Sequence, residues 1–298
     1  MPEYYPVIEV DPDWMLDPES MGTKQKFWYS NPADDSGSTW LFKYPRRDSG
    51  EHWAEKIAAE IAQLLTIPHG HVELAVCEGI RGTTTESFVS SRETLMHGNE
   101  LLGLLVDNYN PGQRRRPTQH NLDTIFLVLQ LTCEQLSPDL IDTTKAQFAS
   151  YLILDALIGN TDRHHENWGV LLDESQENSL KLAPSFDHAS SLGRELSDER
   201  RRRHLAEQTI GNYAARARGG IFESEDDNRR PGPLELACQA IESYADVFRP
   251  GLEELAMLEE GNILEVLNRV PEEWMTDPGK DFAVAMMRNS LEQLGGLI

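Results

Sequence analysis

The chain has 298 residues with 39% hydrophobic content, which is enough to bury a sizeable core in one or two domains. Its 50 acidic and 27 basic residues give a net charge of −23, which disfavours binding to nucleic acid or to anionic membranes. Because no stretch approaches the ~18 consecutive apolar residues of a membrane span and the N-terminus lacks a signal-peptide pattern, we expect a cytoplasmic protein without a membrane partner.

The first 90 residues have the pattern of a small β-sheet with one helix. Strand-like runs lie at 24–29, 39–44, 72–77 and 83–89. The first two runs are rich in aromatic residues and are joined by a polar turn, which predicts a β-hairpin. Between the second and third runs, apolar residues at spacings of three and four over 51–65 predict a helix, which Pro68 ends.

Beyond residue 90 the pattern is mostly helical. Long apolar helices are predicted at 122–136 and 146–158, and helices resume from Leu234. The Gly, Asn, Pro and Arg content of 98–118 predicts a loop. Two short strands are predicted at 168–172 and 180–182, around a polar turn. The sequence therefore predicts an α+β fold.

One motif in the second part points to chemistry. Residues 160–167 read Asn-Thr-Asp-Arg-His-His-Glu-Asn, and an isolated acid, Asp187, follows twenty residues after Asn167. Phosphoryl transfer from Mg-ATP needs one carboxylate beside the acceptor hydroxyl, and an amide and a second carboxylate on the metal. The strands predicted between Asn167 and Asp187 would bring these two side chains back together. The spacing of Asp162, Asn167 and Asp187 therefore predicts a kinase.

Two residues of the first part fit the same chemistry. Lys43 lies between Phe42 and Tyr44 in a predicted strand, where a lysine usually needs a partner for its charge, and the next helix supplies Glu55. A strand lysine that is held by a helix glutamate and directed at the ATP phosphates is the kinase arrangement. The plain alternative is an edge-strand lysine whose ammonium group reaches solvent.

The segment Ser20-Met-Gly-Thr-Lys opens the first aromatic strand. Its glycine and backbone N–H groups offer a phosphate-binding turn, although an ordinary turn is the alternative. Because a net charge of −23 repels ATP at long range, the binding cleft needs local positive charge. We expect that charge to come from Lys24, Lys26, Lys43 and Arg163.

Two segments of the second part closely resemble the HipA-like serine/threonine kinases. The resemblance rests on Leu-Ile-Leu-Asp-Ala-Leu-Ile-Gly-Asn-Thr-Asp-Arg-His-His-Glu-Asn-Trp-Gly-Val-Leu at 152–171 and on Leu-Ala-Pro-Ser-Phe-Asp-His-Ala-Ser at 182–190. It implies a two-lobed, protein-kinase-like fold with a small β-rich N-lobe over 1–90 and a larger, mainly helical C-lobe over 91–298. It also implies that the protein uses ATP and Mg²⁺ to phosphorylate a serine or threonine of a protein substrate.

The resemblance implies a role for each matching residue. Asp162 is the catalytic base toward the acceptor hydroxyl, and Asn167 and Asp187, the latter in the metal-binding segment 183–190, bind Mg²⁺. Lys43 contacts the nucleotide phosphates. The phosphate loop is implied over Gly22 to Lys26, with Gly22, Thr23 and Lys24 as binding residues, and the residues implied for the adenine-binding hinge near 86–90 are Glu86, Ser87 and Phe88.

The chain departs from the family pattern in three places. It begins almost directly at the phosphate loop, as expected of a compact member without the additional N-terminal subdomain of HipA toxins, which leaves a toxin role and an antitoxin-like regulator open. Family members autophosphorylate a serine before this loop. Ser20 is the matching position here, but its spacing to Gly22 is one residue tighter. His188 and Ala189 follow Asp187 where kinases keep Asp-Phe-Gly.

Two other functions fit the same motif. The run Asp162-Arg163-His164-x-x-Asn167 also matches the loop of phosphatidylinositol kinases, in which His164 would assist the base or steady the transferring phosphoryl group. A lipid or small-molecule kinase is therefore one alternative. A pseudokinase that only binds nucleotide is the second alternative.

Several polar residues near the motif admit two interpretations. A zinc cluster of His164, His165 and His188 is conceivable, but structural roles are favoured because no cysteine joins them. Asp155 either faces solvent or supports the loop at 160–167. The arginines at 200–203 either bind an acidic substrate or form a solvated helix face, which their acidic neighbours favour.

Overall fold

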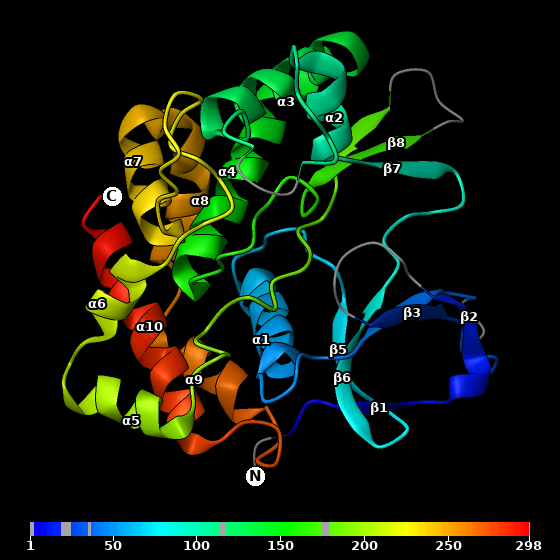
Figure 1. The fold of residues 1–298 in the computed structure, drawn as a ribbon, viewed down its shortest axis with the longest axis vertical. Helices are drawn as coiled ribbons and strands as arrows, with labels where there is room; N and C mark the ends of the chain where they lie inside the picture. The colour runs from blue at the N-terminus through cyan, green and yellow to red at the C-terminus, as the bar shows by residue number, and fades with distance from the viewer. Residues whose placement is uncertain (1–2, 19–24, 35–36, 114–116, 174–178, 298) are drawn as a thin grey trace.

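The structure is a computed structural model that describes residues 3–18, 25–34, 37–113, 117–173 and 179–297. Its N-terminal part is a six-stranded sheet in the order β1-β5-β6-β4-β3-β2, in which β1 and β5 are parallel and the other neighbours antiparallel (Figure 1). The strands are β1 (Val7–Val10), β2 (Met15–Pro18), β3 (Lys26–Tyr29), β4 (Trp40–Lys43), β5 (Val72–Cys77) and β6 (Ile80–Glu86), with a short 3₁₀ turn at Pro12–Trp14.

The aromatic hairpin predicted from the sequence is confirmed. Strands β3 and β4 pair antiparallel, with Lys26 opposite Lys43 and Phe27 opposite Phe42. Because side chains alternate along a strand, the two phenylalanines pack on one face of the sheet, with ring centroids 5.3 Å apart, while both lysines lie on the other face. The hairpin therefore directs two cations to the same face.

The predicted helix at 51–65 is confirmed as α1 (Glu51–Leu64). It packs on β5 and β6, and its side chains Ile57 and Ile61 are fully buried. The opposite side of α1 contacts the helices α4 and α9, so α1 lies between the sheet and the helical part (Figure 1). One helix therefore links the two halves of the molecule.

The helical part is built around α4 (Ile141–Ile158), whose C-terminal residues from Tyr151 to Ile158 are all buried. It packs against α3, α7, α8 and α10. The other helices are α3 (Leu122–Leu136), α5 (Asp198–Ala206), α6 (Ile210–Arg216), α7 (Pro233–Ser243), α8 (Ala245–Ala256), α9 (Glu260–Asn268) and α10 (Asp277–Gly295), with a 3₁₀ turn at Pro138–Leu140. Helix α4 ends at Gly159, which adopts φ +67° as its C-cap and so releases the chain into the segment 160–167.

The hairpin predicted after residue 167 is confirmed and is part of a second sheet. Strands β8 (Gly169–Asp173) and β9 (Leu180–Leu182) pair antiparallel, and β8 also pairs with β7 (Glu93–His97). This hairpin separates Asn167 from Asp187 along the chain, and its return brings both residues to one cavity.

The predicted loop at 98–118 is wrong over its first eight residues, which form α2 (Gly98–Leu105). A capping box stabilises the start of this helix, because the Glu100 carboxylate accepts a hydrogen bond of 2.7 Å from the His97 backbone N–H. Leu101 and Leu102 are buried in the main core. Local packing and capping therefore outweigh the two glycines that lower the helix propensity of this segment.

The α+β class is confirmed, with a β-rich N-terminal part and a larger helical C-terminal part. The exact lobe boundary near residue 90 stays a prediction. None of the helices in the described ranges is both long and apolar enough to cross a bilayer.

Candidate active site

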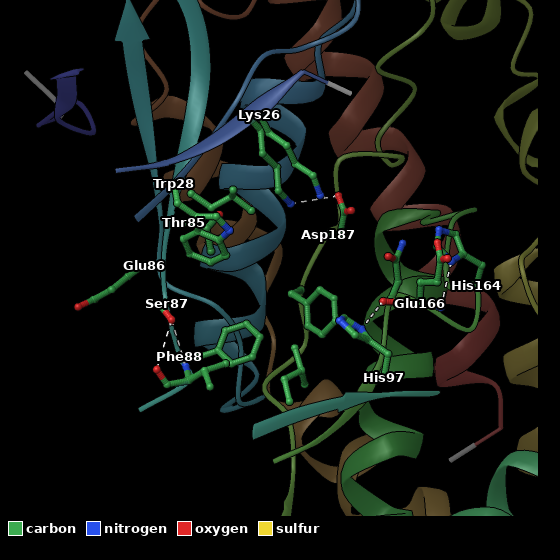
Figure 2. Close-up of a pocket in the computed structure, with 16 residues that line it drawn as sticks. Lys26, Trp28, Thr85, Glu86, Ser87, Phe88, His97, His164, Glu166 and Asp187 are labelled. Atoms are coloured by element: carbon green, nitrogen blue, oxygen red, sulfur yellow. Dashed lines mark hydrogen bonds and ion pairs between the residues drawn. The ribbon is translucent and has the colours of Figure 1, made fainter. Parts of the chain in front are cut away.

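A cavity of about 210 Å³ lies between the sheet and the helical part, and it contains eight of the residues proposed from the sequence. These eight residues are Lys26, Lys43, Glu86, Ser87, Phe88, His164, Asn167 and Asp187. The remaining lining residues are Trp28, Leu41, Thr85, Val89, Leu95, His97, Glu166 and Phe186. Figure 2 shows a polar end near Lys26 and Asp187 and an aromatic end near Phe88.

The polar end is organised by Lys43, which projects from β4. Its Nζ lies 3.3 Å from Asp187 Oδ1, and its side chain is only 11% exposed. Burial opposes the charge of this ammonium group, but the carboxylates of Asp187 and Glu55 outweigh that effect and raise the pKa of Lys43 above its ordinary value. Lys43 is therefore a fixed cation at the end of the cavity.

Glu55 of α1 acts on this site through its charge and through the backbone. Its Oε1 accepts a hydrogen bond of 2.9 Å from the backbone N–H of His188 and lies 3.8 Å from His188 Nδ1. The negative charge of Glu55 also raises the pKa of Lys43, with a smaller effect than that of Asp187. The predicted link between strand lysine and helix glutamate is therefore a three-part arrangement, in which Asp187 is the direct ion-pair partner of Lys43.

Asp187 sits on strained backbone, with φ +59° in the left-handed region. Its neighbour His188 is buried, and its Nε2 is hydrogen-bonded to Ser185 Oγ at 2.7 Å. Burial and the nearby Arg163 cation lower the pKa of His188 well below its ordinary value, so this imidazole is neutral. The hydrogen bond between His188 and Ser185 therefore fixes the turn that presents Asp187 to the cavity.

The segment 160–167 is supported from below by a buried ion pair. Arg163 donates from Nε to Asp155 Oδ2 and from Nη2 to Asp155 Oδ1, both at 2.8 Å. Arg163 Nη1 donates to the carbonyl of Asn167, and Asp155 Oδ1 also accepts from Asn160 Nδ2, again at 2.8 Å. Asp155 therefore supports the loop, and the solvent-facing interpretation is wrong.

Arg163 was expected to supply positive charge to the cavity surface, but it is not among the residues that line the cavity. Its side chain is 3% exposed, and it lies beneath the segment that precedes Asn167, paired with Asp155. Among the described residues, the lysines that line the cavity are Lys26 and Lys43. The sequence could not distinguish these cases, because a charged residue in a loop pattern is usually exposed.

Asn167 is oriented by its own amide group. Its Nδ2 donates a hydrogen bond of 2.7 Å to the Asp162 carbonyl, which places Oδ1, the harder ligand atom, on the other side of the amide plane. Asn167 is 5% exposed and lines the cavity together with Asp187. An amide oxygen and a carboxylate are ligands that suit Mg²⁺, so this pair fits the metal that the sequence implies.

Asp162 lies at the rim of the site, with a side chain that is 45% exposed. His164 Nε2 is 3.9 Å from Asp162 Oδ1, and His164 Nδ1 accepts a hydrogen bond from the Glu166 backbone N–H. On the other side, Ser190 Oγ donates to Asp162 Oδ2 at 3.4 Å. The carboxylate is therefore contacted by Ser190 and His164 and is still partly exposed to solvent.

The opposite end of the cavity is aromatic. Phe88 and Phe186 lie with ring centroids 5.5 Å apart, next to Trp28, Leu41 and Val89. An apolar slot of this kind suits a flat aromatic base. In Figure 2 the Glu86 carboxylate points away from the cavity, where it bonds Ser38 Oγ and His71 Nδ1.

Some of the residues predicted from the sequence cannot be placed, and the described residues do not form the zinc site that was considered. Ser20, Gly22, Thr23 and Lys24 lie outside the described residues. His165, considered as a zinc ligand, is buried and bonds Tyr109 through Nδ1. Among the residues that the structure describes, no group of three or more His, Cys, Asp or Glu side chains is arranged to hold a metal.

The residues missed from the sequence act through the backbone or at a distance. Gly220 passes so close to the catalytic segment that an added Cβ would lie 2.6 Å from the Arg163 carbonyl carbon and 2.7 Å from His164 N. Ser185 and Ser190 connect to the site only through hydrogen bonds that no sequence pattern signals.

Comparisons with known proteins identify a family and a fold. A family model described as the HipA-like C-terminal domain matches residues 19–245. A crystal structure of the Helicobacter pylori proinflammatory kinase CtkA is similar over 97% of this chain and 95% of that chain, with a TM-score of 0.74 and 17% identity. In a complex from Shewanella oneidensis MR-1 of a HipA and HipB toxin–antitoxin system with its operator DNA, one chain is similar over 94% of this chain and 65% of that chain, with a TM-score of 0.58 and 12% identity.

No curated protein sequence matches the chain significantly. At identities this low, the two structural matches establish the fold and nothing further. The predicted two-lobed kinase-like architecture is therefore confirmed, and the site must be interpreted from its own geometry.

Proposed function

We propose that this chain, which belongs to the HipA-like C-terminal domain family, is an ATP-dependent kinase of serine or threonine side chains in proteins. The observation that carries this proposal is the convergence of Lys43, Asn167 and Asp187 on one cavity. Asp162 lies at its rim with an exposed carboxylate. This is the set of groups that phosphoryl transfer requires.

The two ends of the cavity bind different parts of the nucleotide. The slot beside Phe88 and Phe186 receives the adenine, and Lys43 contacts the phosphates at the other end. When bound there by Asn167 and Asp187, Mg²⁺ supplies charge that offsets the phosphate oxygens. Asp162 accepts a hydrogen bond from the acceptor hydroxyl and orients it. Most of the rate enhancement then comes from positioning and from electrostatic stabilisation of the transferring group.

A protein acceptor is favoured by the exposure of Asp162. Its carboxylate lies at an open rim, which suits a side chain presented by an extended peptide. A lipid acceptor would need a surface that attracts an anionic membrane, and a net charge of −23 opposes this. Autophosphorylation of Ser20 is a further part of the proposal, because Ser20 immediately precedes the implied phosphate loop.

The proposal is tested with purified protein, Mg²⁺ and γ-labelled ATP, first alone, then with cell extract, and then with phosphatidylinositol vesicles. Wild type is compared with Asp162→Ala and Asp187→Asn, and the exposed Asp281→Asn is the matched control. Label on serine or threonine of protein that is lost in both site variants and kept in the control supports the proposal. Label on lipid supports the lipid kinase instead, and nucleotide binding without any transfer overturns the catalytic role.

A further inference from the structure

A second cavity, of about 560 Å³, lies at the start of α1, outside the ATP cavity, and is lined by arginines. The five arginines that line it are Arg46, Arg47, Arg81, Arg194 and Arg201, and the single acid among its lining residues is Asp48. They come from the β4–α1 connection, from the start of β6, from the segment that follows Asp187 and from α5. Such a cluster is unexpected in a chain with a net charge of −23.

The acids around this arginine pocket do not neutralise it. Arg46 and Arg194 share one buried carboxylate, that of Glu51, with N–O distances of 3.1 and 2.9 Å. Arg201 pairs with Asp198 at 2.9 Å, and Arg47 lies 3.7 Å from Asp48. These pairs contain four of the five arginines and three acids, and Arg81 is the fifth arginine of the pocket, so the arginines exceed these acids by two. The excess of two positive charges matches the charge of a phosphate monoester dianion.

One donor in the pocket is buried and has no acceptor. The Arg201 side chain is 9% exposed, and its Nε has no hydrogen-bond partner among the residues that the structure describes. Its guanidinium group lies over the Trp53 ring at 5.5 Å, which fixes its plane. A buried N–H group without an acceptor is unfavourable, and a ligand oxygen in the pocket would satisfy it.

The backbone adds to the positive potential. Helix α1 starts beside the pocket with Gly50 as its N-cap, and the Glu51 and Trp53 backbone N–H groups of its first turn donate to Ser49 Oγ and His52 Nδ1. The positive end of the helix dipole therefore faces the same space as the arginines. His52 adds no charge near neutral pH, because burial and the Arg81 cation lower its pKa to about 4.

We propose that the arginine pocket binds a phosphoryl group, as a phosphate monoester or as free phosphate, and that its occupancy is communicated to Asp162. Bidentate arginine contacts are the usual means of recognising a phosphate dianion. The binding itself does not depend on the proposed function. The effect on catalysis rests on it.

Arg194 provides the connection to the active site. Its Nη1 lies in the pocket beside Glu51, while its Nη2 donates a hydrogen bond of 3.0 Å to Ser190 Oγ. Ser190 Oγ in turn donates to Asp162 Oδ2 at 3.4 Å. An anion that fixes the Arg194 guanidinium therefore also fixes Ser190, and with it the carboxylate that orients the acceptor hydroxyl.

Binding is tested by calorimetry with inorganic phosphate, with a phosphoserine peptide and with the unphosphorylated peptide. A Lys43→Met background removes the phosphate-binding cation of the ATP cavity. In this background Arg46→Gln/Arg81→Gln is compared with the exposed Arg202→Gln of α5 as the matched control. We expect saturable binding that weakens at least about 10-fold in the double variant, a loss of two charge-assisted contacts, and is unchanged in the control.

The two ligands distinguish the source of the phosphoryl group. Tighter binding of the phosphoserine peptide than of inorganic phosphate identifies a phosphorylated side chain, and equal binding identifies free phosphate. Absence of saturable binding, or equal affinity in the double variant and the control, overturns the site. Either result is independent of whether the protein transfers phosphate.

Coupling is tested by the rate of label transfer with and without the preferred ligand. We expect the ligand to raise kcat about 5-fold, the lower end of usual coupling, in wild type. The increase should vanish in Arg46→Gln/Arg81→Gln and in Ser190→Ala. Ligand binding without an increase in rate overturns the coupling while leaving the binding site intact, whereas no transfer under any condition contradicts the proposed function instead.

Discussion

Arg163 and Asp155 form a bidentate ion pair that is almost completely buried beneath the segment 160–167. Burial opposes the charge of Arg163, but the Asp155 carboxylate outweighs it and raises the pKa of the guanidinium group. The same guanidinium donates to the Asn167 carbonyl and to Ser185 Oγ. The pair therefore joins the end of α4 to both segments that carry the implied metal ligands.

Asp155→Ala should lower the free energy of unfolding by about 3–5 kcal/mol, because it leaves a buried guanidinium group without its partner. Urea denaturation followed by circular dichroism measures this change. The exposed Asp281→Ala is the control and should change stability by less than about 0.5 kcal/mol. A loss in Asp155→Ala no larger than in the control would show that the pair is not structural.

The double variant Asp155→Leu/Arg163→Met separates stability from positioning. Replacing a buried ion pair by apolar side chains is often neutral for stability, so most of the unfolding free energy should return. The rate of phosphoryl transfer should stay low, at about 1% of wild type or less, because no guanidinium group then fixes the Asn167 carbonyl. A double variant with full activity would contradict the positioning role of Arg163.

Gly220→Ala should lower kcat at least about 10-fold with a modest loss of stability. Its Cβ would lie within 2.7 Å of backbone atoms of Arg163 and His164, and backbone atoms cannot turn aside as a side chain can. The segment that carries Asp162 must therefore shift. Gly261→Ala is the control, because an added Cβ meets nothing within 4 Å there and this position lies in α9. Steady-state kinetics of both variants measure the effect.

The elements that the sequence predicted correctly are those with a strong local pattern. The aromatic alternation of β3 and β4 and the three-and-four spacing of α1 each contain enough information to define the element. Helix α2 was missed, because Gly98 and Gly103 suggest a loop, whereas the capping by Glu100 is a local contact with His97 and the burial of two leucines depends on packing with distant residues. Element type followed periodicity, and tertiary contacts decided the exception.

The same distinction applies to the site. The spacing of Asp162, Asn167 and Asp187 identified residues that the fold places in or beside one cavity. The partner of Lys43 could not be chosen from the sequence, since Glu55 and Asp187 are 12 and 144 residues away from it and both contribute to its charge state. The position of Arg163 was also invisible, because only the buried Asp155 explains why a loop arginine points inward.

His120 should make stability depend on pH between 6.5 and 5. Burial lowers the pKa of His120 to about 3, so the unfolded chain takes up a proton in this window while the folded chain does not. Stability contributed by neutral His120 is present above pH 6.5 and is lost as the pH falls, with a slope of about 1.4 kcal/mol per pH unit.

His120→Gln tests this assignment, because a glutamine amide can both donate to the Gly220 carbonyl and accept from Trp168 Nε1. Urea denaturation at several pH values should show a slope that is smaller by about one proton than in wild type. An unchanged slope would assign the acid sensitivity to other buried groups, such as His188.

Lys43→Met should lower kcat at least about 100-fold, because it removes the fixed cation that offsets charge on the transferring phosphoryl group. The exposed Lys181→Met, which loses only its pair with Glu93, is the matched control.

Glu55→Gln is more informative, since the amide oxygen can still accept from the His188 backbone N–H while the negative charge is lost. Because the Glu55 carboxylate raises the pKa of Lys43, its removal lets Lys43 lose its proton at lower pH. The alkaline limb of the rate profile should therefore begin at lower pH in Glu55→Gln than in wild type, and an unshifted limb would show that Glu55 acts only through the backbone.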